Sequence, residues 1–253
     1  MSLVNLGDAA LAIEVAARAG KRLLDLRAST PRETLGAVGD REAELLIASL
    51  LREARPNDGY FSEEGARDSA RLQQRRVWII DPLDGTREFA ETDRSDWAVH
   101  VALTVDGRPD ACAVALPALG LTFGTAHPPV LPAVSSGPMR IVVSRSRAPS
   151  LAANVAAECD ATLVPMGSAG AKAMAVVRGE AEAYLHAGGM YEWDTCAPVG
   201  VALAAGLHAS RINGSPCLYN LADAAMPDLL ICRKELAEKI LSAIRRTSQG
   251  NPV

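Results

Sequence analysis

The segment from residue 77 to residue 86 constrains the fold most, because an apolar stretch leads directly into two aspartates. Its first residues, Val-Trp-Ile-Ile, are too apolar for the surface, so residues 77–81 are predicted to form a buried strand. Pro82 fixes φ and has no backbone N–H for a sheet ladder, and we therefore expect the chain to turn there. The turn would place Asp84 beside Asp81, so the fold must accommodate two neighbouring acids.

Two clustered carboxylates are costly to bury unless cations neutralise them, and hard oxygen ligands favour Mg²⁺ over zinc or copper. On its own, Asp84-Gly85 would be an ordinary turn dipeptide and Asp81 the cap of a strand end. Further acids at the ends of predicted elements favour the metal interpretation, because together with this pair they can form one oxygen cage. These acids are Asp40, Glu63, Glu64, Glu192 and Asp194.

The first half of the chain, residues 1–126, reads as paired helices on an antiparallel sheet. Apolar residues at helical spacing predict a helix over 8–27. A turn-rich stretch follows from Ser29 to Gly39, and Asp40 stands where the N-cap of a second helix is expected. Short strands are predicted at 59–62, 77–81, 99–105 and 111–116, with a hairpin at Asp106-Gly107.

The second half, residues 139–253, shows a different pattern. Residues 127–138 before it contain four prolines and a Ser-Ser-Gly segment, a composition typical of a linker or loop. Strands and helices then alternate, which implies α/β layering. The fold class is therefore α/β with an α+β first half. The predicted strands are 140–143, 161–165, 182–186 and 228–232, and the predicted helices are 149–158, 169–178, 194–205 and 233–246.

Composition excludes several classes of partner. The net charge of −4 and the lack of a long basic run argue against binding a nucleic-acid polymer, which needs clustered Lys and Arg. No stretch reaches the ~18 apolar residues of a membrane span, and the first residues do not resemble a signal peptide. The five cysteines are scattered and odd in number, so we expect free thiols in a reducing cytoplasm rather than disulfides or a zinc site.

Two segments resemble the signatures of the inositol monophosphatase superfamily. The first is Asp-Pro-Leu-Asp-Gly-Thr at 81–86, and the second is Trp-Asp at 193–194, followed by a helix rich in Gly and Ala. Thr-Arg-Glu-Phe at 86–89 and Glu-Trp-Asp-Thr at 192–195 are similar to segments of the CysQ-type bisphosphate nucleotidases. The resemblance implies the layered αβαβα sandwich of the sugar phosphatases, one catalytic domain over 1–253, and a site between the two halves.

The same resemblance implies metal ligands. Two Mg²⁺ ions are expected, with a third, weaker ion near Glu63 and Asp40, and Mn²⁺ is an alternative metal. The first ion would be held by Glu63, Asp81 and the carbonyl oxygen of Leu83. The second ion would be held by Asp81, Asp84 and Asp194.

Catalytic and phosphate-binding roles follow from the resemblance as well. Thr86, together with Asp40 or Glu63, would orient and deprotonate the attacking water. The backbone N–H groups of Gly85 and Thr86 would bind phosphate oxygens, which agrees with their expected position at a helix start. Two metals about 3.5–4 Å apart would clamp the nucleophile and the leaving oxygen, as phosphoryl transfer requires.

Residues of the second half are expected to contact the substrate. Gly167, Ser168 and Lys172 match nucleotide contacts of CysQ relatives, while Ser144 and Arg145 resemble a second anion-binding pair. Four more residues are expected to contact the substrate. They are Gly85, Thr86 and Arg87, in and directly after the first signature, and Asp194 at the later helix.

Two points stay open at this stage. Ser168 suits a helix N-cap as well as a substrate contact. The four histidines show no metal-ligand spacing, so each is expected to be an ordinary polar or surface residue. Only His186, where many relatives have arginine, is expected near the site.

The expected reaction is Mg²⁺-dependent hydrolysis of the 3′-phosphate of 3′-phosphoadenosine 5′-phosphate to AMP, with its sulfated form giving adenosine 5′-phosphosulfate. Inositol 1-phosphate and fructose 1,6-bisphosphate are alternative substrates for the same metals. The alternative outside the enzymes is that this chain binds metal or phosphate without catalysing a reaction. The resemblance also implies inhibition by Li⁺, a role in sulfate assimilation and a homodimer.

Overall fold

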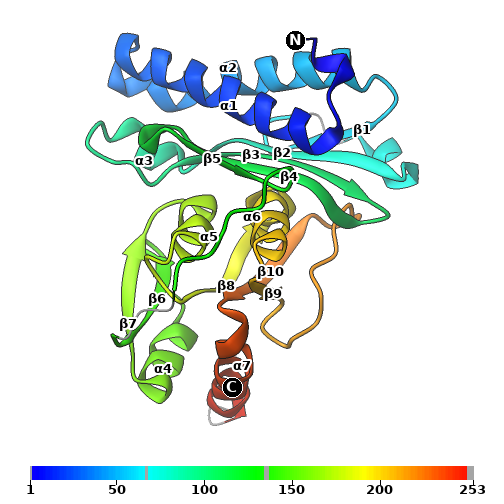
Figure 1. Ribbon diagram of the computed structural model, residues 1–253. Helices are drawn as coiled ribbons and strands as arrows, with labels where there is room; N and C mark the ends of the chain where they lie inside the picture. Colours follow the sequence, from blue (N-terminus) through cyan, green and yellow to red (C-terminus); the bar gives the residue numbers. More distant parts are fainter. Residues whose placement is uncertain (1, 66–67, 134–136, 250–253) are drawn as a thin grey trace.

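Helices and sheets alternate in layers in the computed structural model, which describes residues 2–65, 68–133 and 137–249 (Figure 1). Helices α1 (Asp8–Ser29) and α2 (Arg32–Ala54) cover the outer face of the first sheet. Helices α5 (Ala169–Val177) and α6 (Glu192–Ala204) lie between the two sheets. Helices α4 (Ser150–Cys159) and α7 (Ala237–Gln249) pack together beyond the second sheet. This order of layers confirms the predicted αβαβα sandwich.

The first sheet belongs to the first half of the chain. Its strands, in spatial order, are β1 (Gly59–Ser62), β2 (Arg76–Asp84), β3 (Ala98–Val105), β4 (Arg108–Leu116) and β5 (Leu121–Gly124). β1 pairs with β2 in parallel, and the other neighbours are antiparallel. The four predicted strands and the hairpin at Asp106-Gly107 are confirmed. The edge strand β5 was not predicted.

The second sheet belongs to the second half of the chain. Its strands, in spatial order, are β7 (Ala161–Met166), β6 (Met139–Ser144), β8 (Ala183–Tyr191), β10 (Ala225–Cys232) and β9 (His208–Ser210). The predicted alternation of strands and helices is confirmed, with β9 as an additional short strand. The last helix starts later than predicted, after a 3₁₀ turn. The 3₁₀ turns are Leu3–Asn5, Ser69–Gln73, Pro117–Leu119 and Lys234–Leu236.

The predicted linker at 127–138 lies between the two halves. Residues 134–136 of this stretch lie outside the described residues. The described part contains no helix, and its only sheet pairing is an isolated bridge between His127 and Gly124.

The strand β2 shows why the segment before the first signature had to be apolar. Trp78 and Ile80 face the core under α1 and α2, whereas Val77 and Ile79 face the core around α5 and α6. Both faces of the first sheet are therefore covered by helices, and alternation of polar and apolar residues disappears from its central strands.

The predicted turn at 29–39 and the N-cap at Asp40 are wrong. α2 begins at Arg32, directly after Pro31, whose φ of −57° suits a helix start, and Asp40 lies inside the helix. Gly36 and Gly39, which had favoured a turn, serve close packing instead. A Cβ atom at Gly36 would lie 2.8 Å from Cγ2 of Thr86, and one at Gly39 would lie 2.7 Å from Cε1 of Phe89.

The chain also does not leave the sheet at Pro82. β2 continues to Asp84, but its pairing with β1 ends at Ile80, and its register with β3 shifts between Asp81 and Asp84. Pro82 therefore lies in a bulge where the ladder needs no N–H donor. The expected consequence still holds, since the bulge keeps the two aspartates close together.

The described residues include no helix long and apolar enough to cross a membrane. All five cysteines are buried and free, which confirms the prediction of free thiols.

Arg27, near the end of α1, holds the segment that follows the first signature. Its guanidinium donates to the carbonyl oxygens of Phe89 at 3.0 Å, Glu91 at 2.5 Å and Arg94 at 2.8 Å. It also lies over the ring of Trp97, 5.5 Å from the ring centroid. These contacts close the C-terminal end of the short helix α3 (Thr86–Ala90) and fix its direction.

Replacing Arg27 with alanine should lower the free energy of unfolding by about 2 kcal/mol, because carbonyl oxygens lose a charged donor. Arg22→Ala is the matched control, since its ion pair with Glu42 is exposed and should contribute less than about 1 kcal/mol. Urea unfolding of the three proteins measures the difference. Equal losses for both variants would contradict this account of α3.

Candidate active site

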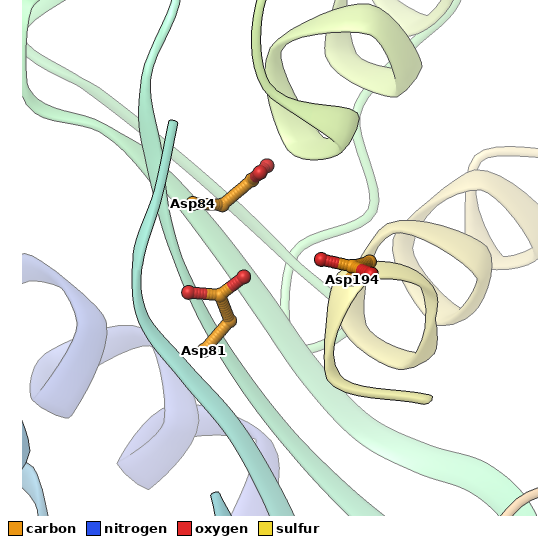
Figure 2. A group of neighbouring side chains, drawn as sticks. All are labelled: Asp81, Asp84 and Asp194. Carbon is orange, nitrogen blue, oxygen red and sulfur yellow. The ribbon is translucent and has the colours of Figure 1, made fainter. Parts of the chain in front are cut away.

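Three carboxylates from two distant parts of the chain meet at the junction of the two halves. Asp81 and Asp84 come from the end of β2, and Asp194 comes from the first turn of α6 (Figure 2). One oxygen of each lies within 4.8 Å of the others. Asp81 and Asp84 are buried, with 1% and 8% of their surface exposed, so water screens their repulsion poorly.

The start of α6 fixes the third carboxylate. Oδ2 of Asp194 accepts a hydrogen bond from the backbone N–H of Tyr191 at 2.6 Å, which caps the helix and sets the direction of the side chain. The neighbouring Glu192 is fully buried and accepts the N–H groups of Asn220 and Leu221. Glu192 therefore fastens a loop to the helix and does not face the other acids.

Asp84 is held by the second half of the chain. Its Oδ2 accepts hydrogen bonds from Oγ of Ser168 at 2.5 Å and from the N–H of Gly170 at 2.7 Å, and it lies 3.2 Å from Nε2 of His100. With Oδ2 so engaged, the other oxygen of Asp84 is the one available to a ligand. Oγ of Ser168 also accepts the N–H of Ala171 at 3.0 Å, so the predicted N-cap is confirmed. Its role as a substrate contact remains a prediction.

The predicted catalytic residues lie around this group. Oγ1 of Thr86 is 3.3 Å from Oδ1 of Asp40 and 3.3 Å from the carbonyl oxygen of Leu83. Position 40 is therefore brought to the site from the middle of α2. Glu63 lies outside the compact group of three acids, at the rim of the cavity. The residue as a whole is exposed, but its carboxyl group is partly withdrawn from water and lies close enough to Asp194 and Asp84 to be repelled by their charges.

Burial and mutual repulsion make several of these acids hard to ionise. Burial, with neighbouring carboxylates, raises the pKa of Asp40 and Glu63 to about 7 and that of Asp194 to about 6. For the same reasons the pKa of Asp81 lies well above its ordinary value. The donor set consists of carboxylate oxygens with the carbonyl of Leu83 nearby, and the positive charge beside it, from His100 and Lys172, acts mainly on Asp84. Such a set fits a hard divalent cation.

Asp84 departs from this trend. Burial alone would raise its pKa, but the charges of His100 and Lys172 and the hydrogen bond from Ser168 hold it below its ordinary value. Lys172 is itself buried, and burial lowers its pKa to about 8. Asp84 therefore stays ionised, whereas the acids beside it, whose pKa values are raised, bind protons more readily.

A cavity of about 350 Å³ opens beside the acids. All residues predicted to contact substrate line it, together with Glu63. The structure thus gathers the expected residues of both halves around one space. The predicted substrate residues are Gly85, Thr86, Arg87, Ser144, Arg145, Gly167, Ser168, Lys172 and Asp194.

The cationic wall of the cavity differs from the expectation in one respect. Arg145 is already paired, since its Nε lies 2.6 Å from Glu88 and its Nη2 lies 3.0 Å from Glu91. Arg147 lines the same wall and, within the described ranges, forms no ion pair. Sequence reasoning missed it, although an Arg-x-Arg pair after a predicted strand was a visible signal. His186 also lines the cavity, as expected, and its Nε2 lies 2.6 Å from the carbonyl oxygen of Gly188.

Comparison with known proteins agrees with this geometry. A family model described as the inositol monophosphatase family matches residues 4–249. The chain belongs to this family. A 3′-phosphoadenosine 5′-phosphate phosphatase of Mycobacterium leprae is 48% identical over 97% of this chain and 96% of its own length. One of Mycobacterium tuberculosis is 50% identical over 89% of both chains.

A solved structure shows the shared fold. CysQ from Bacteroides thetaiotaomicron, a bacterial member of the family, has a TM-score of 0.76 and 24% sequence identity, covering 89% of this chain and 97% of its own. Because curated relatives near half identity are phosphatases, this chain is a phosphatase and not a non-catalytic binding protein.

His100 is the site residue that sequence reasoning placed wrongly. It was expected to be an ordinary polar or surface residue, yet it is fully buried on β3 beside Asp84. Its Nδ1 lies 3.0 Å from the carbonyl oxygen of Trp193. Only the strand register, which pairs His100 with Asp81, could have located it, and that register is a tertiary result.

The raised pKa values predict how pH affects the stability of this phosphatase without metal. A carboxyl group with a higher pKa in the folded state binds more protons when folded, so its contribution to stability is lost as pH rises. For Asp40 the loss should run from pH 4 to about 7, between its ordinary pKa of 3.8 and its raised value.

The free energy of unfolding of metal-free protein should therefore fall across this interval more steeply than that of Asp40→Asn. Saturating Mg²⁺ should reduce the difference, because the ion binds the ionised acids of the folded state. Urea unfolding at several pH values tests both statements. Parallel curves for the two metal-free proteins would show that Asp40 is not forced to protonate.

Proposed function

We propose that this phosphatase hydrolyses the 3′-phosphate of 3′-phosphoadenosine 5′-phosphate to AMP and phosphate in a Mg²⁺-dependent reaction. The observation that carries the proposal is the group of buried acids facing a cavity with a cationic opposite wall. Relatives near half identity carry the name of this activity. The sulfated analogue, giving adenosine 5′-phosphosulfate, is a second proposed substrate.

The acids would hold two Mg²⁺ ions, with Mn²⁺ as a substitute. Glu63, Asp81 and the carbonyl oxygen of Leu83 would hold the first, and Asp81, Asp84 and Asp194 the second. A third, weaker ion would lie near Glu63 and Asp40. When bound, these ions supply the positive charge that stabilises the phosphate oxygens and the departing oxygen.

Thr86 and Asp40 are proposed to orient the attacking water. The hydroxyl of Thr86 donates toward Asp40 or toward the carbonyl of Leu83, which leaves its lone pairs free to accept from a water. Asp40 or Glu63 would then take the proton, and a pKa of about 7 suits a general base at neutral pH. The N–H groups of Gly85 and Thr86 would hold phosphate oxygens at the start of α3.

The wall formed by the second half is proposed to bind the rest of the substrate. Gly167, Ser168 and Lys172 would contact the nucleotide, and Arg87 would be a further substrate contact. Ser144 and Arg145 would form the second anion site. Because Arg145 is shared with two glutamates, the neighbouring Arg147 is the stronger source of charge there. Inositol 1-phosphate and fructose 1,6-bisphosphate remain alternative substrates for the same acids.

The setting of the reaction is also a proposal. Five buried free thiols suit a reducing compartment, so we propose that the enzyme acts in the cytoplasm. Sulfate assimilation is the pathway that the family resemblance implies, and a homodimer is the assembly that it implies.

Phosphate release should be fastest from 3′-phosphoadenosine 5′-phosphate in a panel with inositol 1-phosphate and fructose 1,6-bisphosphate. Activity should require Mg²⁺ and disappear with a chelator, because the acids alone repel a phosphate. Asp84→Asn should lower kcat by orders of magnitude, whereas Asp93→Asn, exposed on the loop after α3, should leave it unchanged. Faster release from inositol 1-phosphate would replace the proposed substrate by the alternative.

Lithium should inhibit the reaction. Li⁺ is a small hard cation that competes for the same oxygen ligands with half the charge of Mg²⁺. Phosphate release should fall with rising LiCl and stay constant in KCl of the same ionic strength. Identical rates in the two salts would count against the proposed metal site.

A further inference from the structure

Glu88 belongs to the Thr-Arg-Glu-Phe segment, and the proposed reaction gives it no role. The residue is buried, with 7% of its surface exposed, and it lines the cavity. Its Oε1 accepts a hydrogen bond from Nε of Arg145 at 2.6 Å. A carboxylate beside a phosphate-binding cavity would repel the substrate, so Glu88 is suited to holding protein groups rather than to contacting a phosphate.

The turn before α5 lies against the same side chain. A Cβ atom at Gly167 would lie 2.4 Å from Cγ and Cδ of Glu88, so only glycine permits this approach. The N–H of Gly167 donates to Oδ2 of Asp96 at 2.6 Å, which fixes the turn to the first half at a second point. Ser168 follows with a φ of +49°, a conformation that residues other than glycine rarely adopt. The turn therefore depends on the groups packed around it.

We propose that Glu88 is a positioning residue for the substrate-binding wall of the second half. It holds Arg145 in the segment after β6 and supports Gly167 in the turn before α5. These two segments supply most of the residues of the second half that are expected to contact substrate. One side chain of the first half thereby sets the distance between the metal-binding acids and the wall opposite them.

Glu91 offers a comparison within the same ion-pair group. It lies 3.0 Å from Nη2 of Arg145, but its side chain is 38% exposed and is not among the residues that line the cavity. Water screens such an exposed pair, which typically contributes little. The position of Arg145 should therefore depend on Glu88 much more than on Glu91.

Two conservative variants separate the position of Glu88 from its charge. Glu88→Asp keeps the carboxylate but is shorter by one methylene group, so it cannot both reach Arg145 and fill the space beside Gly167. Glu88→Gln loses the charge but keeps the length and an acceptor oxygen for Arg145. A positioning role predicts that glutamine is tolerated and aspartate is not, whereas a purely electrostatic role predicts the reverse.

The experiment measures kcat and KM for phosphate release from 3′-phosphoadenosine 5′-phosphate at saturating Mg²⁺, with urea unfolding as a check on folding. Glu88→Asp should raise KM about tenfold, because a buried hydrogen bond between charged groups is lost. It should change kcat little, because the acids keep their places and only substrate binding weakens. Glu88→Gln and the matched control Glu91→Asp should stay within about twofold of the wild-type KM.

The same assay separates this proposal from the proposed function on which it rests. In an active wild type, an unchanged KM of Glu88→Asp, a larger rise of KM in Glu88→Gln, or an equal rise in Glu91→Asp would overturn the positioning role alone. A wild type that releases no phosphate from this nucleotide would overturn the proposed function, and the positioning role with it.

A measurement on the unaltered enzyme covers the case in which Glu88→Asp does not fold. The exchange rate of the Nε hydrogen of Arg145, followed in ¹H–¹⁵N NMR spectra, reports whether this group is bound to Glu88. Exchange should be slow in the Mg²⁺-loaded enzyme and should stay slow when AMP is added. Fast exchange in either state would show that Glu88 does not hold Arg145, and the proposal would be wrong.

Discussion

The repulsion between buried carboxylates at the junction of the two halves is the constraint on which the rest of this structure depends. Asp81, Asp84 and Asp194 lie too close together to be ionised at once without nearby positive charge, and Asp81 and Asp84 are in addition buried away from water. The chain supplies part of that charge from His100 and Lys172. A divalent cation would complete the balance, so the stability of the junction and the chemistry of the site have the same physical cause.

The two halves contribute mostly opposite charge to the cavity, with Arg87 of the first half and Asp194 of the second as the exceptions. Most of its acids come from the first half and the loops that follow its strands, while Arg145, Arg147 and Lys172 come from the second half. Asp84 links the halves, since it belongs to β2 and is held by the start of α5. A substrate with several phosphate oxygens suits a space that has a metal-binding side and a cationic side.

Much of the fold could be predicted from local sequence. The apolar run before Asp81 specified a strand buried on both faces, and the strand–helix alternation after residue 139 specified the second sheet. The prediction failed at Gly36 and Gly39, because glycine is typical of turns and of close helix packing alike. It failed at Pro82 because proline has no N–H group for the sheet ladder, and a bulge accommodates this lack as well as a turn does.

The sequence alone determined which residues are candidates for the chemistry of this family, since residue type and local spacing decide which side chains can offer oxygen ligands and where strands end. Tertiary structure alone decided which of them meet. It brought Asp40 to Thr86 from the middle of a helix, paired Arg145 with Glu88, and placed His100 behind Asp84. These contacts join residues 46, 57 and 16 positions apart, and strand register and helix packing, which set such distances, leave no local pattern in the chain.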